Sequence, residues 1–275
     1  MKTRTLIKPE QINQTDREQS RAHLRKETAM PILEAIDITK DYDSRVLHGL
    51  NVAIEPGSFV AIMGPSGSGK TTFLHILSGL DRPTDGTVKV AGEDLTGMKE
   101  KDLAALRLRR LGFVFQNPHL LRTLCLLDNI ALPGFLAGDE PREEVVARAR
   151  ELMGSMGISG LESSDVAEVS GGQLQRASIC RALINAPEIV IGDEPTGALN
   201  SASAAQVLDI MGEIRARGTT VVLVTHDPTV AVRADRVLLL ADGKITDDVA
   251  LGRYSPEAAA ERTARVTSLL ASHGV

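Results

Sequence analysis

Aromatic residues and cysteines are scarce in this chain. Of its 275 residues, 3% are aromatic, none is tryptophan and two are cysteine. Proteins that bind single-stranded nucleic acid stack the bases on aromatic rings, and few rings are present here. Cys125 and Cys180 stand among apolar residues, without the spacing of metal ligands. We interpret both as small buried thiols of a protein in a reducing compartment.

The sequence also lacks an excess of positive charge and a long apolar run. Its formal net charge is −5 at pH 7, whereas a general nucleic-acid binder needs Lys and Arg to neutralise phosphates. No uninterrupted apolar run approaches the roughly 18–20 residues that cross a bilayer. The N-terminus has no apolar segment typical of a secretory signal. We therefore expect a soluble, cytoplasmic protein with no nucleic-acid partner, whose membrane role depends on a partner protein.

Short apolar runs and helical patterns alternate along most of the chain. The runs are at 59–63, 112–116, 188–194, 219–227 and 236–243. Buried strands that alternate with helices predict a parallel sheet in an α/β fold. Before them, residues 32–38 and 46–54 predict two strands around a turn at 41–44.

The composition along the sequence predicts three parts. Residues 1–30 form a charged extension, in which Thr15 and Glu18 fit a capping box that opens a basic helix. The globular domain is expected at 31–250, and the tail at 251–275 has Ser255 and Pro256 placed to start a last helix.

Strand signals stop between Pro118 and Val169. This segment predicts a helical insertion at about 117–169. A set of apolar residues in it falls on one helical face, which is typical of core packing. Its members are Val145, Ala149, Leu152, Met153 and Met156.

A glycine-rich stretch, "GPSGSGKT", follows the apolar run at 59–63 and precedes a helical pattern. It fits the phosphate-loop spacing G-x-x-x-x-G-K-[ST], and the strand-to-helix context supports the match. Small residues let backbone N–H groups surround phosphates at a helix N-terminus. Lys70 would add a charge at the outer phosphates, and Thr71 would offer a hydroxyl to Mg²⁺. The loop is Gly64, Pro65, Ser66, Gly67, Ser68, Gly69, Lys70, Thr71 and, at its end, Thr72.

Two acidic residues, Asp193 and Glu194, end the apolar run at 188–194. Beside a phosphate loop, Asp193 can hold Mg²⁺, with water between them because Mg²⁺ keeps several of its waters. Glu194 can polarise the attacking water as a general base.

The stretch "EVSGGQLQR", residues 168–176, has two interpretations. One is an ordinary helix start with Ser170 as N-cap. The other is a second phosphate cradle, formed by backbone amides at a helix N-terminus. One ATP needs one phosphate loop, so a second cradle would serve a nucleotide bound to another subunit.

Together these motifs resemble the nucleotide-binding subunit of ATP-binding-cassette (ABC) ATPases over about residues 31–250. The resemblance implies a P-loop NTPase core with a parallel sheet, an antiparallel β subdomain and an inserted helical subdomain. It also implies ATP and Mg²⁺ as cofactors. The elements that carry it, in the family's order, are Tyr42, Gly64–Thr72, Gln116, Ser170–Gln173, Asp193–Glu194 and His226.

The resemblance assigns a role to each matching residue. Tyr42 would stack on adenine, and His226 would contact the γ-phosphate and join Glu194 in catalysis. Gln116 would reach Mg²⁺ and the attacking water, and would sense a membrane partner. The segment at the opposing subunit's ATP would be Ser170, Gly171, Gly172 and Gln173. Thr71, Gln116 and Asp193 would be the residues at the metal.

The segment "FVFQNPHLLRTLCLLDNIALP" resembles the corresponding segment in one branch of the family. That branch contains lipoprotein-release, macrolide-efflux, antimicrobial-peptide-resistance and cell-division ATPases. This implies a dimer with a second ABC subunit, expected to be identical, and a separate membrane permease. The protein would then lie at the inner face of the cell membrane. Arg122 and Cys125 differ from the residues usual at these positions in the branch, which leaves the partner's identity open.

Two other classes were weighed. DNA-repair and translation-type cassettes would carry a coiled coil, zinc modules or a second cassette, which this sequence does not show. A regulatory ATPase that clamps a membrane partner, as in cell division, stays open as the alternative function.

Asn200 is neutral where the resemblance leads us to expect Asp. Asn keeps the size and one acceptor but loses the charge. Three interpretations stay open: a homodimer with two slowed sites, one half of an asymmetric pair, or a neutral replacement.

Overall fold

The computed structural model describes residues 30–273. The elements all fall within the unit Pro31–Val275. The basic helix expected around Thr15 and Glu18 lies outside the described residues. The domain boundaries near residues 30 and 250 therefore stay predictions. In the described part, no helix has the length and apolar character to cross a membrane.

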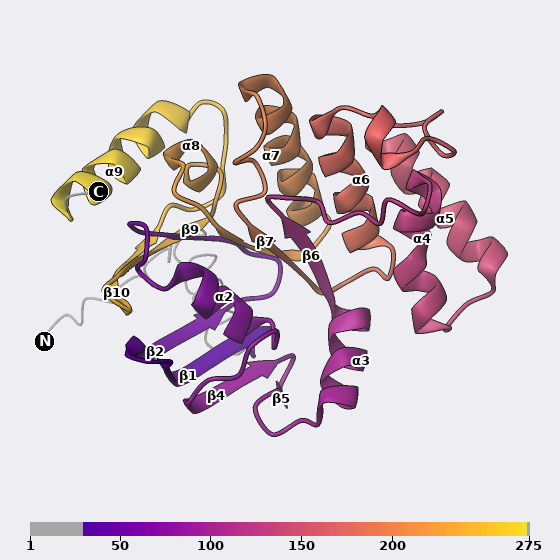
Figure 1. Ribbon diagram of the computed structural model, residues 1–275. Coiled ribbons are helices and arrows are strands. Elements are labelled where there is room, and N and C mark those ends of the chain that lie inside the picture. Colours follow the sequence, from indigo (N-terminus) through magenta and orange to yellow (C-terminus); the bar gives the residue numbers. More distant parts are fainter. Residues whose placement is uncertain (1–29, 274–275) are drawn as a thin grey trace, which may run out of the picture. The chain divides into compact units, whose positions relative to one another are not determined.

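A six-stranded sheet lies at the centre of this unit (Figure 1), in the order β10-β9-β3-β8-β7-β6. The five strands from β9 to β6 are parallel, and β10 is antiparallel to β9. The bounds are β3 Phe59–Met63, β6 Leu111–Phe115, β7 Ile189–Asp193, β8 Thr220–Val224, β9 Arg236–Ala241 and β10 Lys244–Ala250. Every residue of β3 and β8 is buried, as expected of parallel strands covered on both faces.

A smaller antiparallel sheet has the order β2-β1-β4-β5. Its bounds are β1 Leu33–Asp41, β2 Arg45–Ile54, β4 Asp85–Val90 and β5 Glu93–Asp94. The first two confirm the strands expected around residues 41–44. The sequence did not lead us to expect β4, because only Val88 and Val90 of its polar stretch are buried.

Helices occupy both faces of the large sheet. Helix α2 lies between the two sheets, while α6 to α9 lie across the opposite face of the large one (Figure 1). The bounds are α2 Lys70–Leu77, α3 Glu100–Arg110, α4 Leu126–Ala137, α5 Arg142–Ser155, α6 Gly171–Leu183, α7 Ser201–Ala216, α8 Pro228–Ala231 and α9 Ala259–Ser272, with a 3-10 turn at Val166–Glu168. Helices α4 and α5 with the 3-10 turn confirm the predicted helical insertion.

Alternate residues of β3 enter two separate hydrophobic cores. Phe59, Ala61 and Met63 pack with the helices α4 to α7. Val60 and Ile62 pack with α2 and the small sheet. Because side chains alternate along a strand, one short apolar run serves both layers. The ends of this strand are therefore fixed from two sides.

Two local predictions need correction. The last helix begins at Ala259 and not at Ser255, because the Ser255 hydroxyl instead accepts from the Ala258 N–H in a turn (3.4 Å). Cys125 is partly exposed before α4, whereas Cys180 is buried as expected. Burial raises the pKa of the Cys180 thiol to about 12, so this thiol is unreactive.

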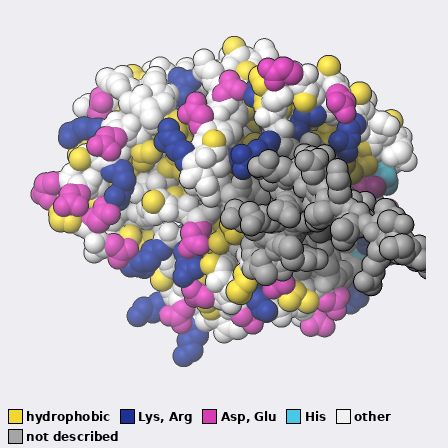
Figure 2. Space-filling view, turned by 180° about the vertical axis from the view of Figure 1, so that it is seen from behind, with side chains coloured by type: hydrophobic (Ala, Val, Ile, Leu, Met, Phe, Trp, Pro, Cys, Tyr) yellow, Lys and Arg dark blue, Asp and Glu magenta, His cyan; other side chains and the backbone are white. Residues whose placement is uncertain are grey.

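The apolar face expected in the insertion is confirmed in its centre, where Val145, Ala149 and Met153 of α5 are buried. Met156 follows the end of α5 and still packs against the same core. On the molecular face shown in Figure 2, positive and negative side chains are interspersed outside the grey atoms.

Candidate functional site

The phosphate-loop sequence connects β3 to α2. Gly64 has φ 148°, and a Cβ there would lie 1.9 Å from the Leu240 carbonyl oxygen, so a side chain cannot fit. Gly69 is left-handed at the N-terminus of α2. Lys70 is buried and its Nζ donates to the Gly64 and Pro65 carbonyls, at 2.9 and 2.8 Å. The loop thus closes around the lysine, and burial lowers the pKa of that lysine.

One buried hydroxyl in this loop has no hydrogen-bond partner in the described part of the chain. Ser68 is 4% exposed, and its Oγ has no hydrogen-bond partner among the described residues. A buried hydroxyl without a partner is costly, so its presence calls for a ligand or water. The phosphate-loop interpretation supplies such a ligand.

The end of β7 brings Asp193 beside the start of α2. Thr71 Oγ1 donates to Asp193 Oδ1 at 3.4 Å. Burial raises the pKa of Asp193, whereas the nearby His75 lowers it. His75 lies one turn along α2 from Thr71. His75 was not singled out from the sequence. Its four-residue spacing from Thr71 was the signal available.

Glu194 and His226 meet beyond the ends of neighbouring strands. His226 Nδ1 lies 2.7 Å from Glu194 Oε1. The Glu194 N–H donates to the Val224 carbonyl of β8, and Glu194 has a left-handed backbone with φ 49°. A left-handed conformation is unfavourable for Glu and is held here by neighbouring structure, which is common at functional sites. The pair leaves His226 Nε2 as the second polar atom of the ring.

Gln116 follows β6 and is exposed. Its amide lies against the turn after Glu194, because a Cβ at Gly197 would be 2.9 Å from Gln116 Nε2. Gln116 is thereby placed next to the acidic pair from a third strand end.

Helix α6 holds the chain on both sides of Gln116. Gln175 donates to the Phe115 carbonyl at 3.0 Å. Arg181 donates to the Pro118 and His119 carbonyls, at 2.6 and 2.9 Å. The helix that begins with the sequence at 170–173 is therefore tied to the loop that carries Gln116.

Ser170 is the N-cap of α6, which confirms the first interpretation of this stretch. The Gln173 N–H donates to Ser170 Oγ, and the Ser170 N–H donates to Gln173 Oε1. A Cβ at Gly172 would lie 2.8 Å from Ser203 Oγ on α7. Within the described residues, no hydrogen bond links Ser170–Gln173 to the phosphate loop. The structure thus does not bring these two predicted parts together within one chain.

Asn200 is the N-cap of α7, because its Oδ1 accepts from the Ser203 N–H at 2.9 Å. This role was not expected from the sequence, although Asn is among the preferred N-cap residues. Tyr42 lies at the turn after β1 and is 59% exposed. Its hydroxyl donates to Asp81 at 2.7 Å.

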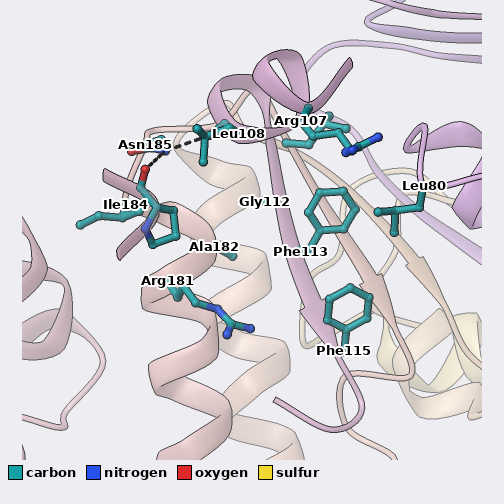
Figure 3. A pocket seen from close by; sticks show the side chains of 13 residues that line it. Leu80, Arg107, Leu108, Gly112, Phe113, Phe115, Arg181, Ala182, Ile184 and Asn185 are labelled. Carbon is teal, nitrogen blue, oxygen red and sulfur yellow. Dashed lines mark hydrogen bonds between the residues drawn. The ribbon is translucent and has the colours of Figure 1, made fainter. Parts of the chain in front are cut away.

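A cavity of about 380 Å³ lies next to the Gln116 loop, between α3, β6 and α6 (Figure 3). Its walls are mostly apolar and include the parallel rings of Phe113 and Phe115, whose centroids are 6.0 Å apart. Leu80, which is 45% exposed, Arg107 and Arg181 also line it. The sequence analysis did not identify this cavity, because its walls come from distant segments.

The model of the ABC transporter family matches residues 47–197. The chain belongs to this family. The matched segment holds the phosphate loop, Gln116, Ser170–Gln173 and the Asp193–Glu194 pair, whereas Tyr42 and His226 lie outside it. The chain is an ABC ATPase, and the predicted P-loop NTPase fold is confirmed by solved structures.

The comparisons include both structures and curated proteins. The dimeric structure of the bacterial ABC transporter cassette MJ0796 is 35% identical, with a TM-score of 0.75, and covers 81% of this chain and 100% of that one. Its post-hydrolysis dimer bound to ADP and Pi is 32% identical, with a TM-score of 0.73 and the same coverage.

The macrolide export ATP-binding/permease protein MacB of Nitrosomonas europaea is 42% identical over 82% of the chain. The pyoverdine export ATP-binding/permease protein PvdT of Pseudomonas entomophila is 43% identical over 82%. These relatives agree with the resemblance to the branch that contains macrolide-efflux ATPases. The chain spans about a third of their length, 35% in both cases.

Proposed function

We propose that this ABC ATPase binds MgATP at the phosphate loop, hydrolyses it within a dimer of two such subunits, and drives a membrane permease. The observation that carries the proposal is the Glu194–His226 contact of 2.7 Å. Glu194 directly follows Asp193, whose carboxylate accepts from Thr71, so the two contacts are adjacent. They lie at the ends of the neighbouring strands β7 and β8. In this proposal a base, an orienting imidazole and a phosphate-binding loop would lie together at one edge of the sheet.

Lys70, the loop amides and the Ser68 hydroxyl would hold the phosphates. Lys70 now donates to two loop carbonyls. Exchange of these for phosphate oxygens would give its ammonium a charged partner. The unpaired Ser68 Oγ and the left-handed Gly69 at the start of α2 support an anion at this position.

The donor set at Thr71 and Asp193 fits Mg²⁺. Both offer hard oxygen atoms, and the Gln116 amide adds another nearby. The described residues contain no group of three or more His, Cys, Asp or Glu that could hold a metal. Mg²⁺ at nucleotide sites needs only one or two carboxylates, because substrate phosphates complete its shell. When bound, the ion would neutralise charge on the phosphate oxygens.

Hydrolysis would use Glu194 as general base. The carboxylate takes a proton from a water whose oxygen attacks the γ-phosphorus, and the bond to the β–γ bridging oxygen breaks to release ADP. His226 holds the carboxylate through Nδ1 and presents Nε2 to the γ-phosphate. Gln116 would help to orient the water.

A second subunit would complete each site. Among the described residues, no hydrogen bond joins Ser170–Gln173 to the phosphate loop, and Ser170 and Gly171 at the capped start of α6 are exposed. Two copies arranged head to tail could place the N-terminal amides of α6 at the opposing γ-phosphate. The MJ0796 structures are dimeric, which supports a dimer of this chain.

The permease would dock at the apolar cavity shown in Figure 3. Its mostly apolar walls suit an apolar segment of the partner. Phe115 and Arg181 belong both to this cavity and to the clamp around Gln116. Docking there would therefore bear on Gln116 and on α6 together. The relatives are named as combined ATP-binding/permease proteins, which supports such a partner at the membrane.

Replacement of Glu194 by Gln tests the chemical part. Glu194→Gln should lower steady-state ATP hydrolysis by at least about a hundredfold, because the general base is lost. ATP binding should persist, and an ATP-bound dimer should accumulate in size-exclusion chromatography. Lys70→Ala is the matched control, since it should weaken ATP binding itself and give no such dimer. Retention of most of the hydrolysis rate by Glu194→Gln would refute the assignment of the base.

A further inference from the structure

Three side chains meet beside the predicted base-stacking residue. Lys40 and Tyr42 come from the end of β1 and the turn after it, and Asp81 comes from the turn after α2. Lys40 Nζ donates to Asp81 Oδ1 at 2.8 Å, and the Tyr42 hydroxyl donates to Asp81 Oδ2 at 2.7 Å. One carboxylate therefore binds two side chains that are about 40 residues away along the chain.

Lys40 also covers the Tyr42 ring. Its Nζ lies 4.8 Å from the ring centroid, in the geometry of a cation–π contact. The Lys40 side chain is only 11% exposed, and its ammonium makes a second hydrogen bond, to the Arg82 carbonyl at 2.7 Å. Tyr42 itself is 59% exposed. One face of the ring is thus occupied by a fixed cation, which leaves the other face for a planar ligand.

Asp81 joins this group to the phosphate-binding helix. Its backbone N–H donates to the His75 carbonyl of α2 at 3.1 Å, and its Oδ1 accepts from the Arg82 N–H at 2.7 Å. Helix α2 begins at Lys70 in the phosphate loop. A single helix therefore carries the phosphate site at its N-terminus and, through Asp81, fixes the aromatic ring.

The charges agree with this geometry. Partial burial alone would raise the pKa of Asp81, but hydrogen bonds from Lys40, Tyr42 and the Arg82 N–H lower it overall. The hydrogen bond to Asp81 raises the pKa of Tyr42. At neutral pH Asp81 is thus a carboxylate and Tyr42 a neutral phenol that donates to it.

We propose that Lys40 and Asp81 are positioning residues for the nucleobase of the bound nucleoside triphosphate. They hold the Tyr42 ring at a set place relative to α2, so that only the face opposite Lys40 stacks on the base. This inference rests on the proposed function, in which Tyr42 stacks on adenine. Because stacking uses the face of the base, the group selects for a planar ring and not for one purine over another.

Nucleotide binding by the full chain tests the proposal. The variants are Tyr42→Ala, Asp81→Ala, Lys40→Met and the double variant Tyr42→Ala/Asp81→Ala. Glu34→Ala is the matched control, because Glu34 forms an ordinary surface ion pair with Lys89 in the same small sheet, at 3.8 Å. Calorimetry measures the Kd of ATP and of tripolyphosphate, which lacks a base. The fluorescence of etheno-ATP, which is quenched on stacking, reports on the base directly.

Asp81→Ala and Lys40→Met should weaken ATP binding by about three- to tenfold, the range of one or two partly exposed charged contacts. They should reduce the quenching of etheno-ATP and leave tripolyphosphate binding unchanged. In the Tyr42→Ala background, Asp81→Ala should add nothing, because both act through the same ring. Glu34→Ala should match the wild type throughout.

The failures can be told apart. If Tyr42→Ala leaves ATP binding unchanged, the proposed stacking role of Tyr42 is wrong. If Tyr42→Ala weakens ATP binding but Asp81→Ala and Lys40→Met do not, only the positioning role is overturned. Equal weakening of ATP and tripolyphosphate by Asp81→Ala would mean that Asp81 supports the phosphate loop, and this would also overturn the proposal.

Discussion

At the scale of single residues, burial of Asp193 disfavours the ionised form of its carboxylate. Burial raises its pKa, so the folded chain holds this proton more tightly than the unfolded chain. The stability linked to that proton is present at acidic pH and is lost as the pH rises through the raised pKa. At pH 8 the ionised group therefore lowers the stability of the nucleotide-free protein.

Asp193→Asn should remove this cost. We expect a higher Tm at pH 8 for the nucleotide-free protein, by about 2–4 °C for each ~1 kcal/mol gained. The difference should shrink as the pH falls through the raised pKa, because protonated Asp is also neutral. Differential scanning calorimetry across pH measures this, with exposed Asp43→Asn as control. A Tm difference independent of pH would contradict the role of the charge. Added MgATP should stabilise the variant much less than the wild type.

The structure also gives Asn200 a definite structural role, which the sequence left open. Its side chain caps α7, and Asp caps a helix equally well. Asn200→Asp should therefore keep the Tm of the protein, whereas Asn200→Ala should lose about 1 kcal/mol of stability.

In the assembled complex, we expect Asn200→Asp to raise the ATPase rate or leave it nearly unchanged, at similar ATP affinity. The restored carboxylate would act across the dimer interface, on the partner's site. Collapse of activity in a variant with normal Tm would show that the interface depends on the amide N–H₂ as a donor.

At the scale of elements, the contact of β6 with α6 sets the position of Gln116. A Cβ at Gly112 of β6 would lie 2.5 Å from the Ala182 carbonyl oxygen of α6. The glycine lets the strand and the helix approach closely enough for Gln175 and Arg181 to reach the loop beyond the strand. Packing at one end of the strand thus supports the site at the other.

Gly112→Ala should separate these two elements and cost about 1–3 kcal/mol of unfolding free energy, as overpacking does. Gly212→Ala is the control, because Gly212 lies within α7 and none of the described atoms would lie within 4 Å of its new Cβ. That change should be neutral or stabilise by up to about 1 kcal/mol. Urea unfolding measures both. If Gly112→Ala is as stable as wild type, the close approach does not matter.

At the scale of the whole molecule, the site is built where two cores meet the edge of one sheet. The two hydrophobic clusters fix β3 from both faces. The phosphate loop, the acidic pair and His226 all follow strands of this sheet. Every motif of the site lies beyond Pro31.

Deletion of residues 1–29 should therefore leave the Kd for ATP and the Tm unchanged within error. Isothermal titration and thermal melting of the truncated and full chains measure this. The seven Lys or Arg against four Asp or Glu of this segment would instead favour an anionic membrane surface or a permease loop. Co-sedimentation with anionic vesicles tests that separate role. A truncated chain that cannot bind ATP would place the domain boundary elsewhere.

The sequence by itself determined the parts that depend on neighbours along the chain. The phosphate loop, the strands β3 and β8, the helical insertion and the N-cap at Ser170 were all predicted, because spacing and periodicity are local. The same holds for the family, whose motifs are short and ordered. Strands β4 and β10 were not predicted. The polar stretch of β4 carries little periodic signal and its partner β1 lies far away in the sequence. Strand β10 pairs with the preceding β9, but none of its residues is buried.

Only the tertiary structure decided which of these parts touch. It joined His226 to Glu194, placed Gln116 against Gly197, and set Asp81 between Lys40 and Tyr42. It also kept the helix start at Ser170 without a hydrogen bond to its own phosphate loop within the described residues. Such contacts depend on how two sheets and their helices pack, and residues far apart in sequence carry no local sign of that packing. For this reason the chemistry could be predicted from motifs, whereas the residues that position it could not.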